Sequence, residues 1–510
     1  MKQIVNVLGK LDWRKKAAAV LLLSAVIAAA SDAQTLTTLH RFDNADCASP
    51  TAALVQAIDG SLYGTTQGGG ATNTGTVFVG TIFAMNLGGA LTTLYSFCPE
   101  GGAMCPNGNA GSAPLIQAAN GELYGTTADG DNGYGSVFEM TLSGALTTIY
   151  DFPYLAWEPE GLVQATNGNF CGATHIGGRR APYCPLVIGC GTLFEITPGG
   201  VPTTLHGFCP EYGCADGTSP SGGLVQAANG DFYGTTEFGG ANCAPYGCGT
   251  VFGITPGGAL TTLYSFCSQP EADCLDGNYP EAGLTQAANG ELYGTTSAGG
   301  VYGYGTIFKI TTGGTLTTLY SFCAQSGCPD GEEPINSLIQ ATDGNLYGTT
   351  PYGGPNCSSN TCGTLFKLTP GGTLTTLYAF CAQPACADGE DPSALVQDTN
   401  GDLYGVTAYG GTGDGSLGLG CGTVFSFSVG LAPFVRMLPA SATVGTAVRI
   451  LGTDLTGATS VTFNGAAAAF EVISPAEIAT AVPVGATSGE VQVVTPNGTL
   501  SSNVPFRVLP

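Results

Sequence analysis

Short alternating runs of apolar and polar residues recur along most of the chain, and they predict β-strands. The run Leu-Tyr-Gly-Thr-Thr or a close variant begins at seven places, namely Leu62, Leu123, Phe170, Phe232, Leu292, Leu346 and Leu403. These runs are rich in aromatic and β-branched residues and are bounded by Gly, Asn and Asp, which is typical of strands. The seven copies define seven units of one tandem repeat.

Each unit contains four predicted strands, a to d, in a constant order. Strand a carries an L-x-Q motif, with its glutamine at Gln56, Gln117, Gln164, Gln226, Gln286, Gln340 and Gln397. Strand b is the Leu-Tyr-Gly-Thr-Thr run. Strand c follows the glycines Gly80, Gly135, Gly191, Gly249, Gly305, Gly363 and Gly422. Strand d ends at Phe97, Phe152, Phe208, Phe266, Phe322 and Phe380. Asn-Gly or Asp-Gly joins a to b, the strongest short hairpin signal, so each unit resembles a propeller blade.

The two ends of the repeat region complement one another. Unit seven stops near Gly430 without a strand d, and a strand of that type stands at residues 36–42 as L-T-T-L-H-R-F. We therefore predict an all-β fold with a closed seven-bladed β-propeller at residues 34–430. The N-terminal strand would complete the last four-stranded blade and remove two open sheet edges.

The N-terminus has the pattern of an export signal. Basic residues precede an apolar run of 14 residues, Ala17 to Ala30, and Ser31-Asp32-Ala33 follows. The alternative is an uncleaved membrane anchor, but a helix needs about 20 apolar residues to span a bilayer. We therefore expect residues 1–33 to be a signal peptide, cleaved after Ala33, and the protein to be secreted or placed at the cell surface.

Composition narrows the partners. The chain has 37 acidic and 13 basic residues and a formal net charge of −24. Nucleic acid is therefore not expected as a partner, because binding its phosphates requires Lys and Arg side chains. No second apolar run approaches membrane length, so no membrane span is expected after residue 33. The sequence also lacks the HExxH, GxSxG and Walker motifs of common enzyme classes.

Residues 433–510 lose the repeat and read as alternating strands separated by turns, which suits a small β-sandwich. The segment resembles the IPT/TIG immunoglobulin-like family. The matching residues are Val444-Gly445-Thr446, Gly452, Val461-Thr462-Phe463-Asn464-Gly465, Pro483, Gly489 and Thr495-Pro496-Asn497-Gly498. The resemblance implies a spacer or interaction domain without catalysis of its own.

The repeat itself resembles the GloVer tandem repeat over residues 36–430, through L-x-Q-A-x-[ND]-G-x-[LF]-Y-G-T-T followed by G-T-[VIL]-F. That resemblance implies an exported bacterial protein of the kind found with varied C-terminal anchors. It brings no established catalytic residues to carry over.

The cysteines fall in local pairs, which in an exported chain predict disulfides. One set follows strand d: Cys98/Cys105, Cys209/Cys214, Cys267/Cys274, Cys323/Cys328 and Cys381/Cys386. A second set precedes strand c: Cys184/Cys190, Cys243/Cys248 and Cys357/Cys362. Both sets lie on the blade face opposite the a–b turns, which we take as the recognition face. A Cys47–Cys421 bridge is expected to lock the closure, and Cys171 is expected to be a buried, inert thiol.

Two alternatives to these pairs stay open. The pairs Cys190/Cys209, Cys248/Cys267 and Cys362/Cys381 could instead bridge the c–d hairpins. Zinc is a competing explanation of closely spaced cysteines, but it needs four converging ligands, and units one and five have a single pair.

Several loop carboxylates could serve a glycoside hydrolase. They are Glu158, Glu160, Asp216, Asp276, Asp330, Glu332, Glu333, Asp388, Glu390 and Asp391. The aspartates of the repeated Asp-Gly element are better explained by a turn role, because a catalytic carboxylate should not recur in every unit. His40 and His206 occupy the tyrosine position of strand d, so a structural role is expected for them as well.

Unit three departs from the repeat. Its d–a loop holds Trp157, and its b–c loop holds His175, Arg179, Arg180 and Tyr183. Aromatic area and directed hydrogen bonds suit a glycan or an acidic ligand. The alternative is a degenerate blade in which Trp157 fills the space of a missing disulfide.

No cofactor is expected, apart from a weak calcium signal at Asp129 and Asp131. We interpret the chain as an exported, non-enzymatic binding or surface-interaction scaffold for carbohydrate or an extracellular protein. The alternatives are a secreted propeller glycoside hydrolase or polysaccharide lyase, and a purely structural extracellular protein. The sequence does not indicate an oligomeric state.

Overall fold

The computed structural model describes residues 34–43, 49–69, 80–97, 109–110, 113–129, 134–153, 156–178, 184, 189–211, 213–243, 246–269, 274–357, 362–411 and 420–510. Within these ranges every regular element is a β-strand except one 3-10 turn, η1 (Pro384–Cys386). The predicted all-β class is confirmed.

The four strand types occur in all seven units. Strand a is β2 (Val55–Gln56), β7 (Ile116–Gln117), β12 (Val163–Gln164), β16 (Thr218–Gln226), β20 (Thr285–Gln286), β24 (Ile339–Gln340) and β29 (Val396–Gln397). Strand b is β3 (Leu62–Thr66), β8 (Leu123–Asp129), β13 (Phe170–Gly177), β17 (Phe232–Phe238), β21 (Leu292–Thr296), β25 (Leu346–Thr350) and β30 (Leu403–Tyr409). Strand c is β4 (Thr81–Met85), β9 (Ser136–Met140), β14 (Thr192–Ile196), β18 (Thr250–Ile254), β22 (Thr306–Ile310), β26 (Thr364–Leu368) and β31 (Thr423–Ser428). Strand d is β5 (Leu91–Ser96), β10 (Leu146–Asp151), β15 (Pro202–Gly207), β19 (Leu260–Ser265), β23 (Leu316–Ser321), β27 (Leu374–Ala379) and β1 (Thr35–Arg41).

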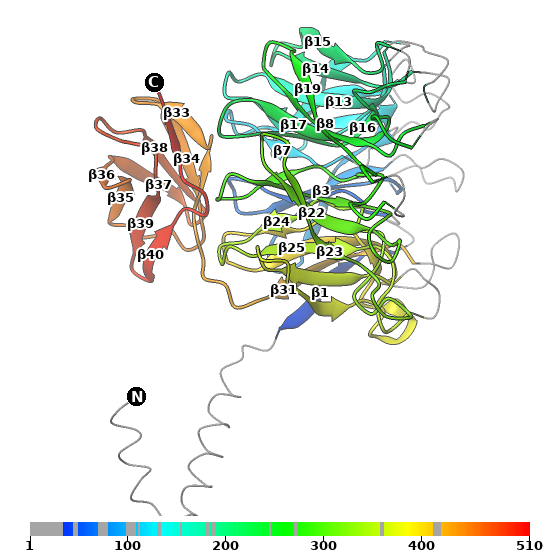
Figure 1. The fold of residues 1–510 in the computed structure, drawn as a ribbon. Coiled ribbons are helices and arrows are strands. Elements are labelled where there is room, and N and C mark those ends of the chain that lie inside the picture. Colours follow the sequence, from blue (N-terminus) through cyan, green and yellow to red (C-terminus); the bar gives the residue numbers. More distant parts are fainter. Residues whose placement is uncertain are drawn as a thin grey trace, which may run out of the picture.

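Each unit forms an antiparallel sheet in the order d, c, b, a. The N-terminal strand β1 pairs with β31, with Leu36 opposite Phe427, so it supplies the strand that unit seven lacks, as the sequence indicated. Figure 1 shows β1 and β31 side by side, although they stand at opposite ends of the repeat region. Three further short strands pair with the far part of strand b: β6 (Asn109–Ala110), β11 (Ala156–Pro159) and β28 (Glu390–Pro392).

Neighbouring sheets are joined by one repeated aromatic contact. The phenylalanine after strand d meets the phenylalanine of strand c in the next unit edge to face, with ring centroids 5.1 to 6.1 Å apart. The seven pairs are Phe42–Phe83, Phe97–Phe138, Phe152–Phe194, Phe208–Phe252, Phe266–Phe308, Phe322–Phe366 and Phe380–Phe425. The pair that includes Phe42 joins the sheet of unit seven to that of unit one, and Leu62 and Val424 belong to the same buried cluster.

The glycine of Leu-Tyr-Gly-Thr-Thr provides the space for that ring. Gly294 lies opposite Phe308 in the ladder of β21 and β22. A Cβ on Gly294 would lie 2.6 Å from Cζ of Phe308 and 2.8 Å from Leu284. Gly64, Gly125, Gly172, Gly234, Gly348 and Gly405 stand in the same relation to the phenylalanines of their own units. The glycine of strand b therefore leaves a space, which we call the glycine slot, and the phenylalanine of strand c fills it.

The L-x-Q glutamine ties each unit to the preceding one. Gln117 Oε1 accepts a hydrogen bond from the backbone N–H of Ile58 at 2.9 Å, and the same contact recurs in every unit. The last of the series runs from Thr399 N–H in unit seven to Gln56 Oε1 in unit one, at 3.1 Å.

The C-terminal segment forms separate sheets around its own core. Its strands are β32 (Arg436–Leu438), β33 (Ser441–Thr443), β34 (Ala447–Leu451), β35 (Ser460–Phe463), β36 (Ala466–Ala467), β37 (Phe470–Ser474), β38 (Glu477–Ala481), β39 (Val491–Thr495), β40 (Gly498–Ser501) and β41 (Arg507–Leu509). They form sheets β32-β34-β38-β37 and β36-β35-β39-β40 and the parallel pair β33-β41. Ile450, Ile478 and Val493 lie fully buried between them.

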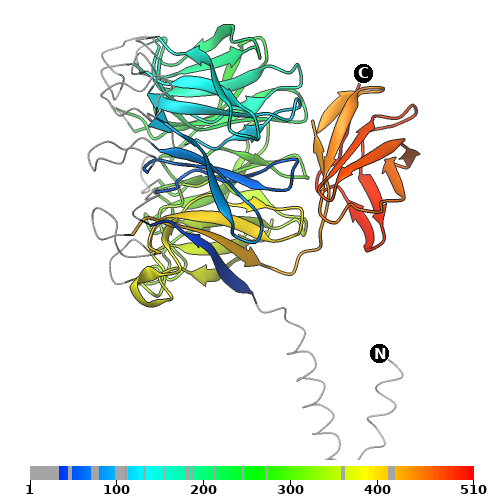
Figure 2. The same ribbon diagram turned by 180° about the vertical axis from the view of Figure 1, so that it is seen from behind.

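This domain packs against the a–b turns of the repeat region (Figures 1 and 2). Arg436 Nη2 donates to the Gln397 carbonyl at 3.0 Å, and Phe434 N–H donates to the Thr399 carbonyl at 2.9 Å. The hydroxyls of Thr399 and Thr453 are 2.9 Å apart. Among the described residues, the structure contains no helix with the length and apolarity needed to cross a bilayer.

Filling one glycine slot should weaken the sheet-to-sheet packing. We expect Gly294→Ala to lower the free energy of unfolding by about 1–3 kcal/mol, because the added methyl group must displace the Phe308 ring. Gly313→Ala is the matched control, since it lies in the exposed c–d turn of the same unit and its Cβ would be 3.7 Å from the nearest atom. Urea unfolding followed by circular dichroism measures both. Equal free energies of unfolding for the two variants would contradict the claim that Gly294 provides the space for the Phe308 ring.

Candidate functional site

The repeat region contains a cavity of about 450 Å³. It is lined by the segments that lead into strand a of several units and by residues at the far end of strand b in units three and four. Glu160, His175, Glu237 and Glu281 line it, together with small side chains such as Ser221. We call it the carboxylate cavity. Because strand b runs from the a–b turn toward the b–c loop, the cavity lies on the disulfide side of the sheets, away from the C-terminal domain.

Backbone geometry places the two glutamates that precede strand a. Glu160 follows Pro159, and Glu281 follows Pro280. The residue before each such proline has a positive φ between 43° and 57°, in Ser49, Glu158, Ser219, Tyr279, Glu333 and Asp391. The N–H of Tyr279 donates to the Cys248 carbonyl of the preceding unit at 3.0 Å, and four other units repeat this bond. These repeated backbone features fix the position of the residue after the proline, while its identity varies between units. The six residues are Thr51, Glu160, Ser221, Glu281, Ile335 and Ser393.

The other two ionisable residues of the cavity lining directly follow the second threonine position of the strand-b motif. His175 belongs to β13 and Glu237 to β17, and His175 Nε2 lies 3.7 Å from Glu237 Oε2. The other units have Gln67, Ala128, Ser297, Pro351 and Ala408 at this place. An ionisable pair here is therefore a property of units three and four alone.

The cavity disfavours charge on its own residues. Burial raises the pKa of Glu160 to about 7, and repulsion from Glu158 and Glu237 acts in the same direction. Burial and then repulsion from Glu281 raise the pKa of Glu237 to about 7. Burial lowers the pKa of His175. The described lining of the cavity has several carboxyls within reach of one another and neither Lys nor Arg, so it gains from hydrogen-bond donors or positive charge in a ligand.

Aromatic and acidic side chains extend this environment into units five to seven. The rings of Phe238 and Tyr279 meet edge to face with centroids 5.5 Å apart. Burial raises the pKa of Tyr352, and the nearby charges of Asp391 and Glu333 add to that rise. Burial also raises the pKa of Asp391 to about 6, with a contribution from Glu390. The charge of Glu281, which lines the carboxylate cavity, also raises the pKa of Tyr352, so this group is electrostatically linked to the cavity.

The structure brings one residue of the sequence-predicted ligand site into the cavity, namely His175. Trp157 lies in β11 opposite Ile176 of β13, next to Glu158, and its side chain is outside the described set. Arg179, Arg180 and Tyr183 lie outside the described residues, as does Asp131 of the calcium motif, while only the backbone of Asp129 is described.

Sequence reasoning missed Glu237 and Glu281. Glu237 stands at a repeat position where no other unit carries a carboxylate, and Glu281 at one where only unit three does, as Glu160. Comparing the units column by column would have revealed this variation. It would not have shown that the two columns face one cavity.

The repeated Asp-Gly aspartates anchor strand d. Tyr264, Tyr320 and Tyr378 donate hydroxyl hydrogen bonds of 2.7 Å to Asp276, Asp330 and Asp388 respectively. In unit three His206 replaces the tyrosine, and its Nε2 lies 2.9 Å from Asp216 Oδ2. These contacts give the aspartates, and His206, the structural role expected from their repetition.

Seven disulfides join sequence neighbours in the described residues. They are Cys184–Cys190, Cys209–Cys214, Cys243–Cys248, Cys267–Cys274, Cys323–Cys328, Cys357–Cys362 and Cys381–Cys386. Cys421 is also disulfide-bonded. Cys47, Cys98 and Cys105 lie outside the described residues. Cys171 is a buried free thiol, and burial raises its pKa to about 12.

Comparison with protein families matches both parts of the chain. A model described as Gloeobacter/Verrucomicrobia repeat matches residues 25–181 and 158–425, and the IPT/TIG domain model matches residues 434–508. Both agree with the resemblances found in the sequence. No curated protein matches the chain.

Solved structures resemble the fold at low identity. A fungal alcohol oxidase of the AA5 family, solved with copper, is 12% identical, with a TM-score of 0.51 over 93% of this chain and 99% of that one. PorZ, a surface component of the type-IX secretion system of Porphyromonas gingivalis, is 15% identical, with a TM-score of 0.45 over 92% of this chain and 60% of that one. The first of these likenesses supports the fold alone.

The raised carboxyl pKa values predict a pH dependence of stability. A carboxyl with a pKa of about 7 in the fold and 4.5 as its ordinary value binds protons more tightly when folded, so its contribution to stability is lost as the pH rises toward 7. We expect Glu160→Gln/Glu237→Gln to lose less stability between pH 5 and pH 8 than the unmodified chain. Urea unfolding at both pH values tests this, with the exposed Glu471→Gln as control. A variant with an unchanged pH profile would contradict the expectation.

Proposed function

The chain belongs to the Gloeobacter/Verrucomicrobia repeat family, and on this premise we propose that it is an exported scaffold that binds carbohydrate in the carboxylate cavity. The observation that carries the proposal is the convergence of Glu160, His175, Glu237 and Glu281 from three different units on one cavity of about 450 Å³.

The scaffold in this proposal is a closed seven-bladed propeller. Three observations support it: the edge-to-face contact of Phe42 with Phe83, the glutamine bond from Thr399 to Gln56, and the pairing of β1 with β31. Each continues between units seven and one a contact or strand that every other unit has. Such a ring leaves no unpaired terminal sheet edge, which suits a protein that works outside the cell.

The chemistry of the cavity suits a sugar better than an anion. Ionised carboxylates accept hydrogen bonds, and a saccharide presents a dense set of hydroxyl donors. The volume lies in the range of small-ligand sites, about 300–1,000 Å³. Apolar side chains in the lining, among them Ile335, Ile339 and Leu395, offer apolar area for a pyranose ring. An anionic ligand would instead face several carboxyls, and the described lining offers it neither Lys nor Arg.

Export and surface placement follow from the N-terminal pattern and the disulfides. A basic segment and an apolar run precede residue 34, and seven disulfides stabilise the described loops. Disulfides persist in oxidising compartments. The IPT/TIG domain packs on the opposite side of the sheets, so it leaves the carboxylate cavity uncovered.

A glycan array of residues 34–510 tests the binding proposal. We expect binding to at least one neutral glycan, weakened at least tenfold by Glu237→Gln/Glu281→Gln, because an amide replaces an acceptor pair at each position. Glu471→Gln should bind like the unmodified chain. A Trp157→Ala/Arg179→Ala/Arg180→Ala variant separates a contribution of the unit-three loops from that of the cavity. Binding unchanged in both site variants, or no binding to any glycan, would refute the proposal.

A glycoside hydrolase is the second candidate, and the two carboxyls with a pKa of about 7 favour it. A general acid needs such a raised pKa beside an ionised partner, and the charge of Glu237 contributes to the raised pKa of Glu160. If this candidate holds, reducing sugar will be released from a bound polysaccharide. Glu160→Gln or Glu237→Gln would then lower kcat by 100-fold or more while binding persists. Binding without turnover would leave the scaffold proposal alone.

A further inference from the structure

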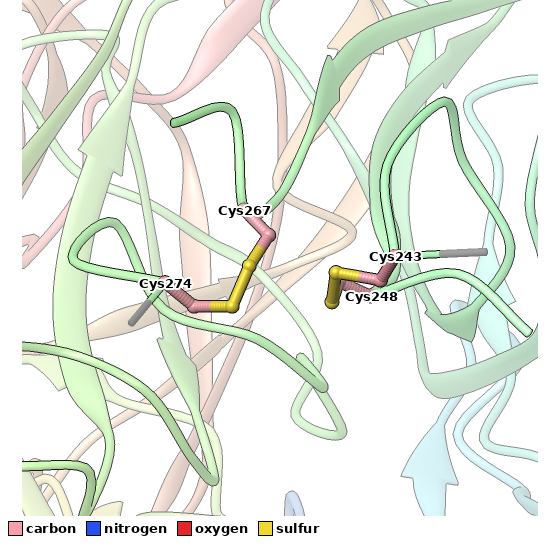
Figure 3. A group of neighbouring side chains, drawn as sticks. All are labelled: Cys243, Cys248, Cys267 and Cys274. Atoms are coloured by element: carbon pink, nitrogen blue, oxygen red, sulfur yellow. A yellow bond between two sulfur atoms is a disulfide. The ribbon is translucent and has the colours of Figure 1, made fainter. Parts of the chain in front are cut away.

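Four cysteines of unit four meet at one place on the disulfide side of the sheets. Cys243 and Cys248 belong to the loop between β17 and β18, and Cys267 and Cys274 to the segment after β19. All four Sγ atoms lie within 4.8 Å of one another. Figure 3 shows the two disulfides, Cys243–Cys248 and Cys267–Cys274, side by side. We call these residues the four-cysteine group.

Backbone hydrogen bonds that do not involve sulfur hold the four-cysteine group together. The Cys248 carbonyl accepts from Tyr279 N–H at 3.0 Å, and the Cys274 carbonyl accepts from Gly277 and Gly300 N–H at 2.8 and 2.9 Å. Asn242, next to Cys243, donates from its Nδ2 to the carbonyls of Ser265 and Phe266 at 3.1 and 2.8 Å. The loops therefore have contacts that persist when the disulfides are opened.

The four sulfur atoms are close enough to form a tetrahedral thiolate site once the disulfides Cys243–Cys248 and Cys267–Cys274 are opened. Zinc binds thiolate sulfur at about 2.3 Å in a tetrahedron, so its sulfur ligands lie about 3.8 Å apart. Reaching that geometry from a group already within 4.8 Å requires small side-chain movements. Cys248 and Cys267 are buried, and Cys243 is exposed, so an ion has a route from solvent.

The neighbouring units do not offer the same set in the described residues. Unit three brings together three sulfur atoms, those of Cys184, Cys190 and Cys209. Units five and six bring together two sulfur atoms and one carboxylate, with Glu332 and Glu390 respectively. A set of four neighbouring sulfur atoms is thus described in unit four, where the sequence predicted two local disulfide pairs.

We propose that the four-cysteine group is a redox-controlled zinc site. A dithiol or phosphine reductant supplies two electrons to each disulfide, and two protons from solvent complete each pair of thiols. One Zn²⁺ then replaces the four thiol protons, which leave to solvent, and forms four zinc–sulfur bonds. In the oxidised chain the same sulfur atoms are joined in pairs, and no zinc is bound there.

Cobalt(II) is the probe, because a tetrahedral thiolate site gives it strong visible and near-ultraviolet absorption. Residues 34–510 are reduced with a phosphine without oxygen, freed of reductant and titrated with Co²⁺, then with Zn²⁺. We expect one equivalent of tetrathiolate Co²⁺ that Zn²⁺ displaces. The signal should be absent from the oxidised chain and lost in Cys243→Ser/Cys274→Ser. Cys323→Ser/Cys328→Ser, in unit five, is the matched control and should keep it.

Folding is followed in the same samples by far-ultraviolet circular dichroism. Loss of the β-sheet signal on reduction would overturn the proposal, because the group would then depend on its disulfides. A tetrathiolate signal that persists in Cys243→Ser/Cys274→Ser would overturn it too, since the ion would be bound elsewhere. The variant Cys243→Ala/Cys248→Ala opens one disulfide by design. If it stays folded but gives no tetrathiolate signal, ligand loss rather than unfolding explains the result and supports the proposal.

Discussion

The structure of the repeat region depends on one contact, the edge-to-face meeting of two phenylalanines between neighbouring sheets. Each pair contributes about 0.5–1.5 kcal/mol beyond the burial of its rings. The contact exists because a glycine in strand b leaves room for the ring of strand c, as Gly64 does for Phe83. Two motifs far apart in each unit are therefore halves of one packing device. The same contact through Phe42 draws the N-terminal strand against unit one.

A frame that repeats its packing so strictly leaves other positions free to differ. The residue after the conserved proline and the residue after Thr-Thr have fixed backbones but are not needed for sheet packing. Units three, four and five place Glu160, His175, Glu237 and Glu281 there, and the other units place residues without an ionisable side chain. Binding chemistry can thus change at these positions without loss of the fold, which is the arrangement expected of a recognition scaffold.

The sequence predicted what depends on local pattern. Asn-Gly hairpins, the four strands, the strand supplied by residues 36–42 and the two families all follow from motifs and their order. The structure also joins the neighbouring cysteines that the sequence paired. The sequence could not predict contacts that depend on how several loops converge in space. Glu237 and Glu281 are far apart in the chain: Glu237 stands in β17, and Glu281 follows Pro280 and the left-handed residue Tyr279.

The cysteines show the same division between pattern and convergence. From sequence, zinc remained a competing explanation that needs four converging ligands, and a bridge across the c–d hairpin such as Cys248/Cys267 remained an alternative to the local pairs. The c–d hairpin of β18 and β19 brings the two pairs of unit four together, because the first residue of β18, Thr250, is paired with the last residue of β19, Ser265. Cys267 and Cys274 both have positive φ, at 58° and 48°, a backbone conformation that no spacing rule reveals. One hairpin therefore both continues the sheet and gathers four sulfur atoms at its open end, so the repeat determines where new chemistry can arise as well as how the sheets pack.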